Sequence, residues 1–370
     1  MRALRDLSAV LLLCSLAGCS HTSGANDPLR SGSASLKTSV ARFEATVERL
    51  ADEKKIPGLS VAVLKDQKVV LARGFGFADL DRQVAATADT PYDIASVTKP
   101  LSAVVAMKLV EMRLLDLDRP IAGYSQWAAF CADFSEATSI FAKGLRCDPP
   151  MHTLRHLLSH TAIGIPGERF SYNPVIYSWA SRPMKSAAGE SFSSLTERLV
   201  FKPAGMTRSA RRHRDLPLRE DLARDLALRY RIDESGRVRP GEPASAQGDG
   251  AAGGVFSTVY DLAKFDIALE NGTLVLPSSY ATMMTPTLNN KGESLPYGIG
   301  WYLQDHAGEK LAWHSGWWEN AASAIYLKVP GKGLTLIMLA NSEGLWWRNA
   351  LDKAEIEKSD FVAAFLKEFL

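Results

Sequence analysis

Residues 96–100 read Ser-Val-Thr-Lys-Pro and contain the only S-x-x-K pattern in the chain. The pattern follows a β-like segment and a turn, and it opens a helical period that runs to about residue 115. Because residues three positions apart share a helix face, the ammonium group of Lys99 can reach the hydroxyl of Ser96. A desolvated lysine with a lowered pKa can act as the base that a serine needs to attack an acyl carbon. The segment therefore predicts a serine nucleophile with a lysine partner.

The start of this helix would add a second catalytic element, the positive end of the helix dipole beside a developing oxyanion. The alternative is an ordinary helix start, in which Ser96 caps the helix and Lys99 is a solvated charge. S-x-x-K alone does not separate the two interpretations, because short patterns recur by chance. The choice between them depends on the segments around it.

Away from this segment, hydrophobic periodicity predicts a domain built from both ends of the chain. Strands are expected at about 59–64, 69–77 and 298–304, and a hairpin at 321–329 and 334–340. Helices are expected at 259–270 and 354–370, and another around Phe43, Val47 and Leu50. The sequence thus predicts an α/β part over 39–120 and 250–370, interrupted by a mostly helical insertion over 121–249.

Seven segments between about residues 40 and 345 share their content and order with a known superfamily. They are Ser96–Pro100 (SVTKP), Thr153–Thr161 (TLRHLLSHT), Phe170–Asn173 (FSYN), Phe201–Met206 (FKPAGM), Ala252–Thr258 (AGGVFST), Tyr297–Trp301 (YGIGW) and His314–Gly316 (HSG). In these segments the sequence resembles the serine β-lactamase, penicillin-binding protein and esterase superfamily, most closely its class C-like branch. The resemblance implies an α+β, β-lactamase/transpeptidase-like fold, with an antiparallel sheet flanked by helices and the site beside the helical insertion.

The resemblance also implies roles for individual residues. Ser96 matches the acylated nucleophile and Lys99 its partner, while Tyr172 matches the tyrosine of the Y-x-N motif, which passes a proton to the leaving group. His314, Ser315 and Gly316 match the K-T-G or H-x-G strand that lines the site. The backbone amides of Ser96 and of Trp317 would form the oxyanion hole, which makes Ser315, Gly316 and Trp317 candidates for substrate binding. No metal or organic cofactor is implied.

Three departures from the superfamily pattern bear on the substrate. Tyr172 is followed by Asn173 and Pro174, so the candidate substrate-binding asparagine stands one position early. The H-T-S-G segment reads His-Thr-Ala-Ile-Gly over 160–164, which reshapes a loop. His314 stands where β-lactamases usually carry lysine, and a neutral imidazole attracts a substrate carboxylate less than an ammonium group does. This last departure favours an uncharged ester over a penicillin.

The first residues of the chain have the layout of a bacterial export signal. A positive end with Arg2 and Arg5 precedes an apolar stretch and small residues that lead to Cys19. Residues 16–19 read Leu-Ala-Gly-Cys, which resembles a lipobox, so residues 1–18 are predicted to be a lipoprotein signal peptide and Cys19 the lipidated residue. Residues 19–38 have the composition of a flexible tether. Ser20 after the cysteine favours an outer-membrane location facing the periplasm, with the lipid as the membrane contact; a plain secretory signal is the alternative.

Two cysteines remain once Cys14 and Cys19 are accounted for. Cys131 and Cys147 form an even pair in an oxidising compartment, which predicts a disulfide. The alternative is two free buried thiols.

Three histidines could in principle form a metal site. His152, His156 and His160 are spaced four residues apart, which on one helix would align their imidazoles. The competing interpretation, that they belong to the superfamily's R-H-L-L-x-H segment, is favoured, and no metal is expected.

Tryptophans follow the His-Ser-Gly segment. Because adjacent strand residues point to opposite faces, either Trp317 or Trp318 is placed to line the pocket and contact an apolar acyl group.

Charge excludes nucleic acid as a partner. The 370-residue chain has a formal net charge of +2, whereas nucleic-acid binders carry a basic excess. The arginines between residues 208 and 225 alternate with acidic residues, which is typical of a solvated face, with anionic lipid as the alternative contact.

The sequence therefore predicts a serine hydrolase that acts through an acyl-enzyme on an ester or amide. Carboxylesterase, β-lactamase and D-alanyl peptidase share these motifs, so the ligand is a small acyl compound or a peptidoglycan-like molecule. The alternative from another functional class is an anchored module that binds penicillin or peptidoglycan without turnover.

Overall fold

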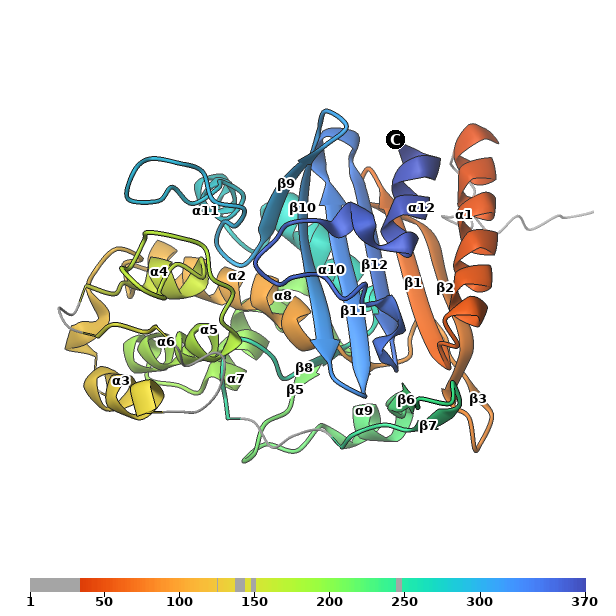
Figure 1. Cartoon of the computed structure of the whole chain (residues 1–370), viewed down its shortest axis with the longest axis horizontal. Helices are drawn as coiled ribbons and strands as arrows, with labels where there is room; N and C mark the ends of the chain where they lie inside the picture. The colour runs from red at the N-terminus through yellow and green to blue at the C-terminus, as the bar shows by residue number, and fades with distance from the viewer. Residues whose placement is uncertain (1–33, 125, 137–143, 148–150, 244–247) are drawn as a thin grey trace, which may run out of the picture. The chain divides into compact units, whose positions relative to one another are not determined.

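The structure is a computed structural model that describes residues 34–124, 126–136, 144–147, 151–243 and 248–370 (Figure 1). The predicted signal peptide and Cys19 lie outside the described residues. The predicted tether ends earlier than residue 38, because helix α1 (Ala34–Glu53) already begins at Ala34. No helix among the described residues is long and apolar enough to cross a membrane.

A seven-stranded antiparallel sheet forms the centre of the fold, and it joins the two ends of the chain. Its order is β3 (Val84–Ala85), β2 (Lys68–Asp79), β1 (Gly58–Lys65), β12 (Leu334–Ala340), β11 (Ala322–Val329), β10 (Glu309–Trp318) and β9 (Tyr302–His306). The N-terminal strand β1 pairs with β12 along its length, from Leu59 opposite Ala340 to Lys65 opposite Leu334. The predicted α+β fold with an antiparallel sheet is therefore confirmed.

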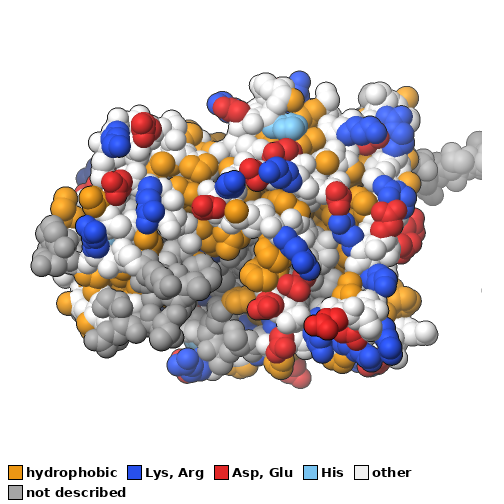
Figure 2. All heavy atoms as spheres, viewed as in Figure 1, with side chains coloured by type: hydrophobic (Ala, Val, Ile, Leu, Met, Phe, Trp, Pro, Cys, Tyr) orange, Lys and Arg blue, Asp and Glu red, His pale blue; other side chains and the backbone are white. Residues whose placement is uncertain are grey.

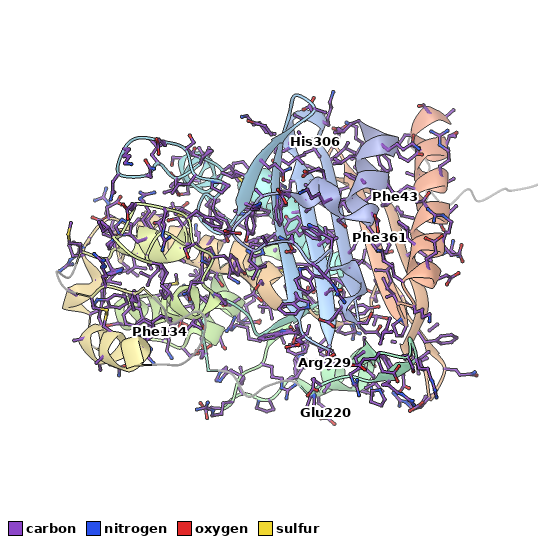
Figure 3. The ribbon with its side chains drawn as sticks, viewed as in Figure 1. Phe43, Phe134, Glu220, Arg229, His306 and Phe361 are labelled. Atoms are coloured by element: carbon purple, nitrogen blue, oxygen red, sulfur yellow. A yellow bond between two sulfur atoms is a disulfide. The ribbon has the colours of Figure 1, made fainter. Side chains whose placement is uncertain are left out.

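Alternation along the central strands gives the sheet two buried faces. Leu59, Val61 and Val63 of β1 belong to one hydrophobic cluster, together with Phe43 of α1 and Phe361 of α12 (Asp360–Phe369). Figure 1 shows α1 and α12 side by side over this face, and Figure 3 shows Phe43 and Phe361 pointing from them. The intervening Ala62 and Leu64 belong to the other cluster, so both faces of β1 are covered.

The opposite face carries the helices that position the site. They are α2 (Thr98–Glu111) and α10 (Val259–Glu270). Nearly all residues of α2 are buried, including Lys99 and Ser102, because the helix runs through the middle of the core. The expected helix from 96 to 115 is shorter than predicted, since residues 95–97 form a 3₁₀ turn and α2 ends at Glu111.

The segment between α2 and β8 (Val255–Ser257) supplies most of the small helices. They are α3 (Trp127–Glu136), α4 (Leu154–Leu158), α5 (Pro174–Trp179), α6 (Ser181–Ala188), α7 (Phe192–Thr196), α8 (Lys202–Ala204) and α9 (Glu220–Asp225). Short strands join them: β5 (Ala210–Arg211) pairs with β8, which pairs with β4 (Tyr92–Asp93), and β6 (Tyr230–Ile232) pairs with β7 (Val238–Pro240). Helix α11 (Pro277–Met283) follows α10.

Two predicted elements have different bounds in the structure. The strand expected over 298–304 is β9, which begins only at Tyr302, because the backbone before it packs on helices. A Cβ on Gly298 would lie 2.2 Å from the Met283 carbonyl oxygen, and Gly300 has a φ of +82°. The closing helix expected over 354–370 is α12, which begins at Asp360 after a 3₁₀ turn at Ile356–Lys358.

Charged side chains between residues 208 and 225 form ion pairs with one another. Arg219 contacts Asp221, and Arg208 and Arg224 both contact Asp225. In Figure 2, basic and acidic side chains lie together over α9, β6 and β7. Such exposed pairs contribute little to stability, and they form a solvated surface of mixed charge.

Cys131 of α3 and Cys147 form a disulfide, with their Cα atoms 5.9 Å apart. The bond joins residues separated by 16 positions, so it restricts the unfolded chain. We expect Cys131→Ser to lower the free energy of unfolding by about 3 kcal/mol, measured by urea unfolding without reductant. Cys147→Ser and the double variant should lose the same amount, because each removes the same bond. An unchanged unfolding midpoint in all three variants would contradict the prediction.

Candidate active site

The predicted nucleophile lies in a tight turn between β4 and α2. Asp93, the last residue of β4, accepts a hydrogen bond from the amide of Ala95 at 2.9 Å, and Ala95 has a φ of +45°. Non-glycine residues rarely adopt this left-handed backbone, so surrounding contacts must hold it there. The turn places Ser96 at the start of α2, beside the sheet.

Lys99 lies beneath Ser96 and is fully buried. Its Nζ is 2.6 Å from Ser96 Oγ and 3.3 Å from the carbonyl oxygen of Ala252. Burial disfavours the charged form and lowers the pKa of Lys99 well below its ordinary value. A neutral amine at this distance has a lone pair that can accept the Ser96 proton.

Tyr172 approaches Ser96 from the insertion. Its hydroxyl donates a hydrogen bond to Ser96 Oγ at 3.0 Å. Burial raises the pKa of Tyr172 above its ordinary value, so the phenol keeps its proton near neutral pH. The structure therefore brings Ser96, Lys99 and Tyr172 into direct contact, although they come from segments 76 residues apart.

A layer of buried aromatic side chains supports this contact, and sequence reasoning missed it. The His160 ring packs at a tilt against those of Tyr172 and Tyr177, with ring centroids 4.3 Å and 5.1 Å away. The Tyr177 hydroxyl donates a hydrogen bond to the Lys99 carbonyl oxygen at 3.0 Å. Tyr297 lies 4.9 Å from His160. The seven motifs contain His160 and Tyr297, but nothing in the sequence indicated that they pack behind Tyr172.

His314 is buried on β10 and is a neutral imidazole. Burial, and then the proximity of Lys99, lower its pKa well below the ordinary value. Its Nδ1 lies 2.7 Å from the Ser315 carbonyl oxygen, which can only accept, so Nδ1 carries the proton. Its Nε2, 3.0 Å from the Tyr297 hydroxyl, is then the acceptor. His314 therefore offers no permanent positive charge to a substrate.

Gly316 lets strand β10 approach the nucleophile turn. A Cβ on Gly316 would lie 2.3 Å from the Ile94 carbonyl oxygen and 3.2 Å from the Ala95 side chain. Only glycine allows this contact, which brings the backbone of Ser315 and Trp317 next to the turn that carries Ser96. Larger residues at position 316 would push the strand away.

Asn173 has a structural role that the sequence prediction did not include. It is the N-cap of α5, and its side-chain oxygen accepts hydrogen bonds from the amides of Val175 and Ile176. The backbone N–H of Asn173 donates a hydrogen bond to His160 Nδ1 at 3.0 Å. Asn173 is buried and does not line the cavity in front of Ser96, whereas Pro174 does. The predicted substrate-binding role is therefore not supported by its position.

The cavity in front of Ser96 has a volume of about 540 Å³ and an aromatic wall. Ser96, Tyr172, His314 and Ser315 line it together with Trp317 and Trp318. Trp317 stacks on Trp346 at 4.3 Å, and its Nε1 donates to Glu343. Both tryptophans line the cavity at the end of β10, where the sequence led us to expect only one of them.

The three histidines do not share a helix. Helix α4 spans only Leu154–Leu158, so His152 precedes it and His160 follows it with a φ of +56°. His152 Nε2 lies 2.9 Å from the Ala162 carbonyl oxygen. Within the described part of the chain, no three His, Cys, Asp or Glu side chains are placed to hold a metal ion.

Comparison with known proteins shows the family and the fold. The family model described as Beta-lactamase matches residues 43–359. Protein flp of Staphylococcus aureus (strain NCTC 8325 / PS 47) is 23% identical over 327 residues, covering 81% of this chain and 62% of the relative, so the chain spans less than two thirds of its length.

Two solved structures show the same fold. The octameric penicillin-binding protein homologue from Pyrococcus abyssi superposes with a TM-score of 0.70 at 25% identity, over 89% of this chain and 77% of the other. EstCE1, a hydrolase with promiscuous acyltransferase activity, superposes with a TM-score of 0.68 at 17% identity, over 89% and 99% of the two chains.

Proposed function

The chain belongs to the beta-lactamase family, and from this premise we propose that it is a serine hydrolase that cleaves esters or amides through an acyl-enzyme at Ser96. One observation carries the proposal. Ser96 Oγ is contacted both by Lys99 Nζ at 2.6 Å and by the Tyr172 hydroxyl at 3.0 Å. Burial lowers the pKa of Lys99 and raises the pKa of Tyr172, which are the directions that a base and a proton donor need.

In the acylation step, Ser96 Oγ attacks the substrate carbonyl carbon while its proton moves to neutral Lys99. The carbonyl oxygen becomes an oxyanion, which the backbone amides of Ser96 and Trp317 stabilise. The tetrahedral intermediate then expels the alcohol or amine, which takes a proton from Tyr172, and Lys99 returns its proton to Tyr172. Neutral Lys99 then accepts a proton from a water molecule, whose oxygen attacks the acyl carbon. The second tetrahedral intermediate breaks its bond to Ser96 Oγ and releases the acid, and Ser96 Oγ takes the proton from Lys99, so the enzyme ends as it began.

The cavity supports an uncharged group next to the scissile bond. His314 is neutral and its two ring nitrogens already have partners in Ser315 and Tyr297. Trp317 and Trp318 offer an apolar surface for the acyl chain. We therefore propose carboxylesters as the preferred class, ahead of penicillins.

The test is turnover of p-nitrophenyl butyrate and of nitrocefin by the purified protein, with the mass at Ser96 followed by mass spectrometry. Ester turnover with slow nitrocefin hydrolysis, both lost in Ser96→Ala, is the expected result. Rapid nitrocefin hydrolysis would instead make the protein a β-lactamase and remove the inference drawn from His314. Ester turnover that survives in Ser96→Ala would overturn the mechanism.

A second candidate function rests on Asn173. The family's Y-x-N amide is absent from the cavity, because this asparagine caps α5 and Pro174 follows it. Such a change favours a module that is acylated without release, or a D-alanyl peptidase with altered substrate contacts. A stable adduct on Ser96 with nitrocefin and no ester turnover would support this candidate.

We also propose that the protein is exported and anchored by lipid at Cys19 in the outer membrane. The support is the sequence of residues 1–20. Mass spectrometry of the N-terminal peptide of the protein from membranes tests this. The expected peptide begins with an acylated Cys19, and an unmodified N-terminus beyond it would overturn the proposal.

The aromatic wall leads to a prediction about substrate choice. We expect Trp317→Ala to lower the ratio of kcat/KM for p-nitrophenyl hexanoate over acetate by about tenfold, because the longer chain loses its apolar contact. The variant Trp346→Ala should have a similar effect, since Trp346 stacks on Trp317. Trp347→Phe is the matched control, because Trp347 packs on Trp313 and does not line the cavity. An unchanged ratio in Trp317→Ala would contradict the prediction.

A further inference from the structure

A second cavity of about 750 Å³ adjoins the one in front of Ser96. Trp318 and Glu319 line both cavities, so the two meet at the end of β10. In Figure 3, Arg229 lies below the lower ends of β10 and β11, at the position of this second cavity. Most of its wall is apolar and includes Leu218, Leu226 and Phe256. The proposed reaction does not use this space.

The most buried charges of the second cavity neutralise each other. Asp93 accepts from the Ala95 amide with one carboxylate oxygen and forms an ion pair with Arg229 through the other. Both side chains are largely buried, with 7% and 15% of their surface exposed. A ligand in the cavity therefore meets neither a free carboxylate nor a free cation at this pair.

Arg212 is a different case. Its side chain lines the cavity, and it forms no hydrogen bond or ion pair within the described part of the chain. Its backbone is fixed at the end of β5, where its amide donates to the Gly254 carbonyl at 2.8 Å. The preceding residue, Arg211, points the other way and donates to the carbonyl oxygen of Gly250. Arg212 thus lines the cavity just beyond the end of β5. It attracts the Asp93 carboxylate electrostatically, but the oxygens of Asp93 already contact the Ala95 amide and Arg229, so no hydrogen bond or ion pair among the described residues holds the Arg212 side chain.

The two exposed acidic residues of the wall do not pair with Arg212. Glu242 and Glu319 also line the cavity, but both are exposed to solvent and neither lies within ion-pair distance of Arg212. An exposed carboxylate is well solvated and leaves the guanidinium available. His213 and Arg214 also line the cavity, and neither carries a negative charge that could pair with Arg212.

We propose that this second cavity is a subsite for an apolar chain that ends in a carboxylate, which pairs with Arg212. A guanidinium can hold a carboxylate through two parallel hydrogen bonds, and the apolar wall suits the chain that leads to it. The inference rests on the proposed function, because it names the substrate as an ester whose acyl chain carries a carboxylate away from the scissile bond. This agrees with neutral His314, which leaves the region beside the scissile bond without a cation.

Binding to the Ser96→Ala variant tests the subsite without any turnover. Monomethyl suberate and dimethyl suberate, which differ in one charge, are titrated calorimetrically into the purified full-length variant. The charged ligand should bind at least tenfold more tightly, and added salt should reduce the difference. Arg212→Gln should abolish the difference and Arg212→Lys should keep part of it. The control Arg237→Gln, which removes an exposed arginine outside the cavity, should keep all of it.

Turnover gives a second readout in the protein with intact Ser96. The ratio of kcat/KM for monomethyl suberate over methyl octanoate should fall by about tenfold in Arg212→Gln, mainly through KM, and should stay unchanged in Arg237→Gln. Thermal melting of each variant checks that it is folded.

The outcomes separate this inference from the proposed function. Equal binding of the two suberates, or a difference that survives in Arg212→Gln, overturns the subsite even if p-nitrophenyl butyrate is hydrolysed. A charge preference that depends on Arg212, in a protein that hydrolyses no ester, upholds the subsite and overturns the hydrolase.

Discussion

Replacing Lys99 with methionine is expected to lower kcat/KM for p-nitrophenyl butyrate by about 10³- to 10⁴-fold. Methionine has a similar length and volume, so it fills the buried site without a cavity and removes only the amine. Ser96 then keeps its position in the turn before α2 but has no base within reach, because Tyr172 is protonated. Steady-state kinetics with the ester measures the loss.

The same residue predicts the pH dependence of the wild-type protein. Protonated Lys99 cannot accept the Ser96 proton, so kcat/KM should fall as the pH drops through the pKa of Lys99 and level off above it. Because burial lowers that pKa, the midpoint should lie well below 10.5. A midpoint near the ordinary value of lysine would contradict a desolvated base.

The matched control is Lys108→Met, on the same helix. Lys108 forms an ion pair with Glu111 near the end of α2 and does not contact Ser96. Its loss should leave kcat/KM and the pH profile close to wild type. Near-normal turnover in Lys99→Met would instead exclude Lys99 as the base.

The second large effect is expected for Tyr172→Phe, which removes only the hydroxyl that donates to Ser96 Oγ. We expect kcat/KM for ethyl butyrate to fall by about 10²- to 10³-fold, because an alkoxide leaving group needs a proton. The loss should be smaller for p-nitrophenyl butyrate, since p-nitrophenolate leaves as a stable anion. Rates with both esters, measured side by side, test this difference.

Tyr260→Phe is the control for this variant, because Tyr260 is exposed on α10. It should keep wild-type rates with both esters. Equal losses with the two esters in Tyr172→Phe would indicate that Tyr172 positions Ser96 and donates no proton to the leaving group.

Much of the fold could be predicted from hydrophobic periodicity. The hairpin β11–β12 and helix α10 were expected nearly at their observed bounds, because apolar runs with turn residues between them have few alternatives. Residues 298–301 were mistaken for strand, since periodicity cannot distinguish a strand from an apolar segment whose glycines pack against a helix. A Cβ on Gly300 would lie 2.6 Å from the Ala103 side chain of α2.

The site could be predicted where the contacting residues are close in the sequence, and less well where they are far apart in it. Ser96 and Lys99 are three residues apart, so helix geometry alone placed them together. The role of Asn173 was readable in retrospect, because an asparagine before a proline is a common helix start. The packing of His160 behind Tyr172 and the cavity lined by Arg212 depend on segments that meet only in the folded chain.

The pairing of β1 with β12 has a consequence for how the chain folds. The two strands lie about 270 residues apart, yet they are neighbours at the centre of the sheet. A nascent chain that ends before Leu334 therefore holds β1 with one edge unpaired, and such edges recruit other strands into aggregates. The high contact order of this pairing makes folding slow and dependent on the last translated segment. Truncation at the C-terminus should thus be more harmful than loss of an equal length from the surface loops.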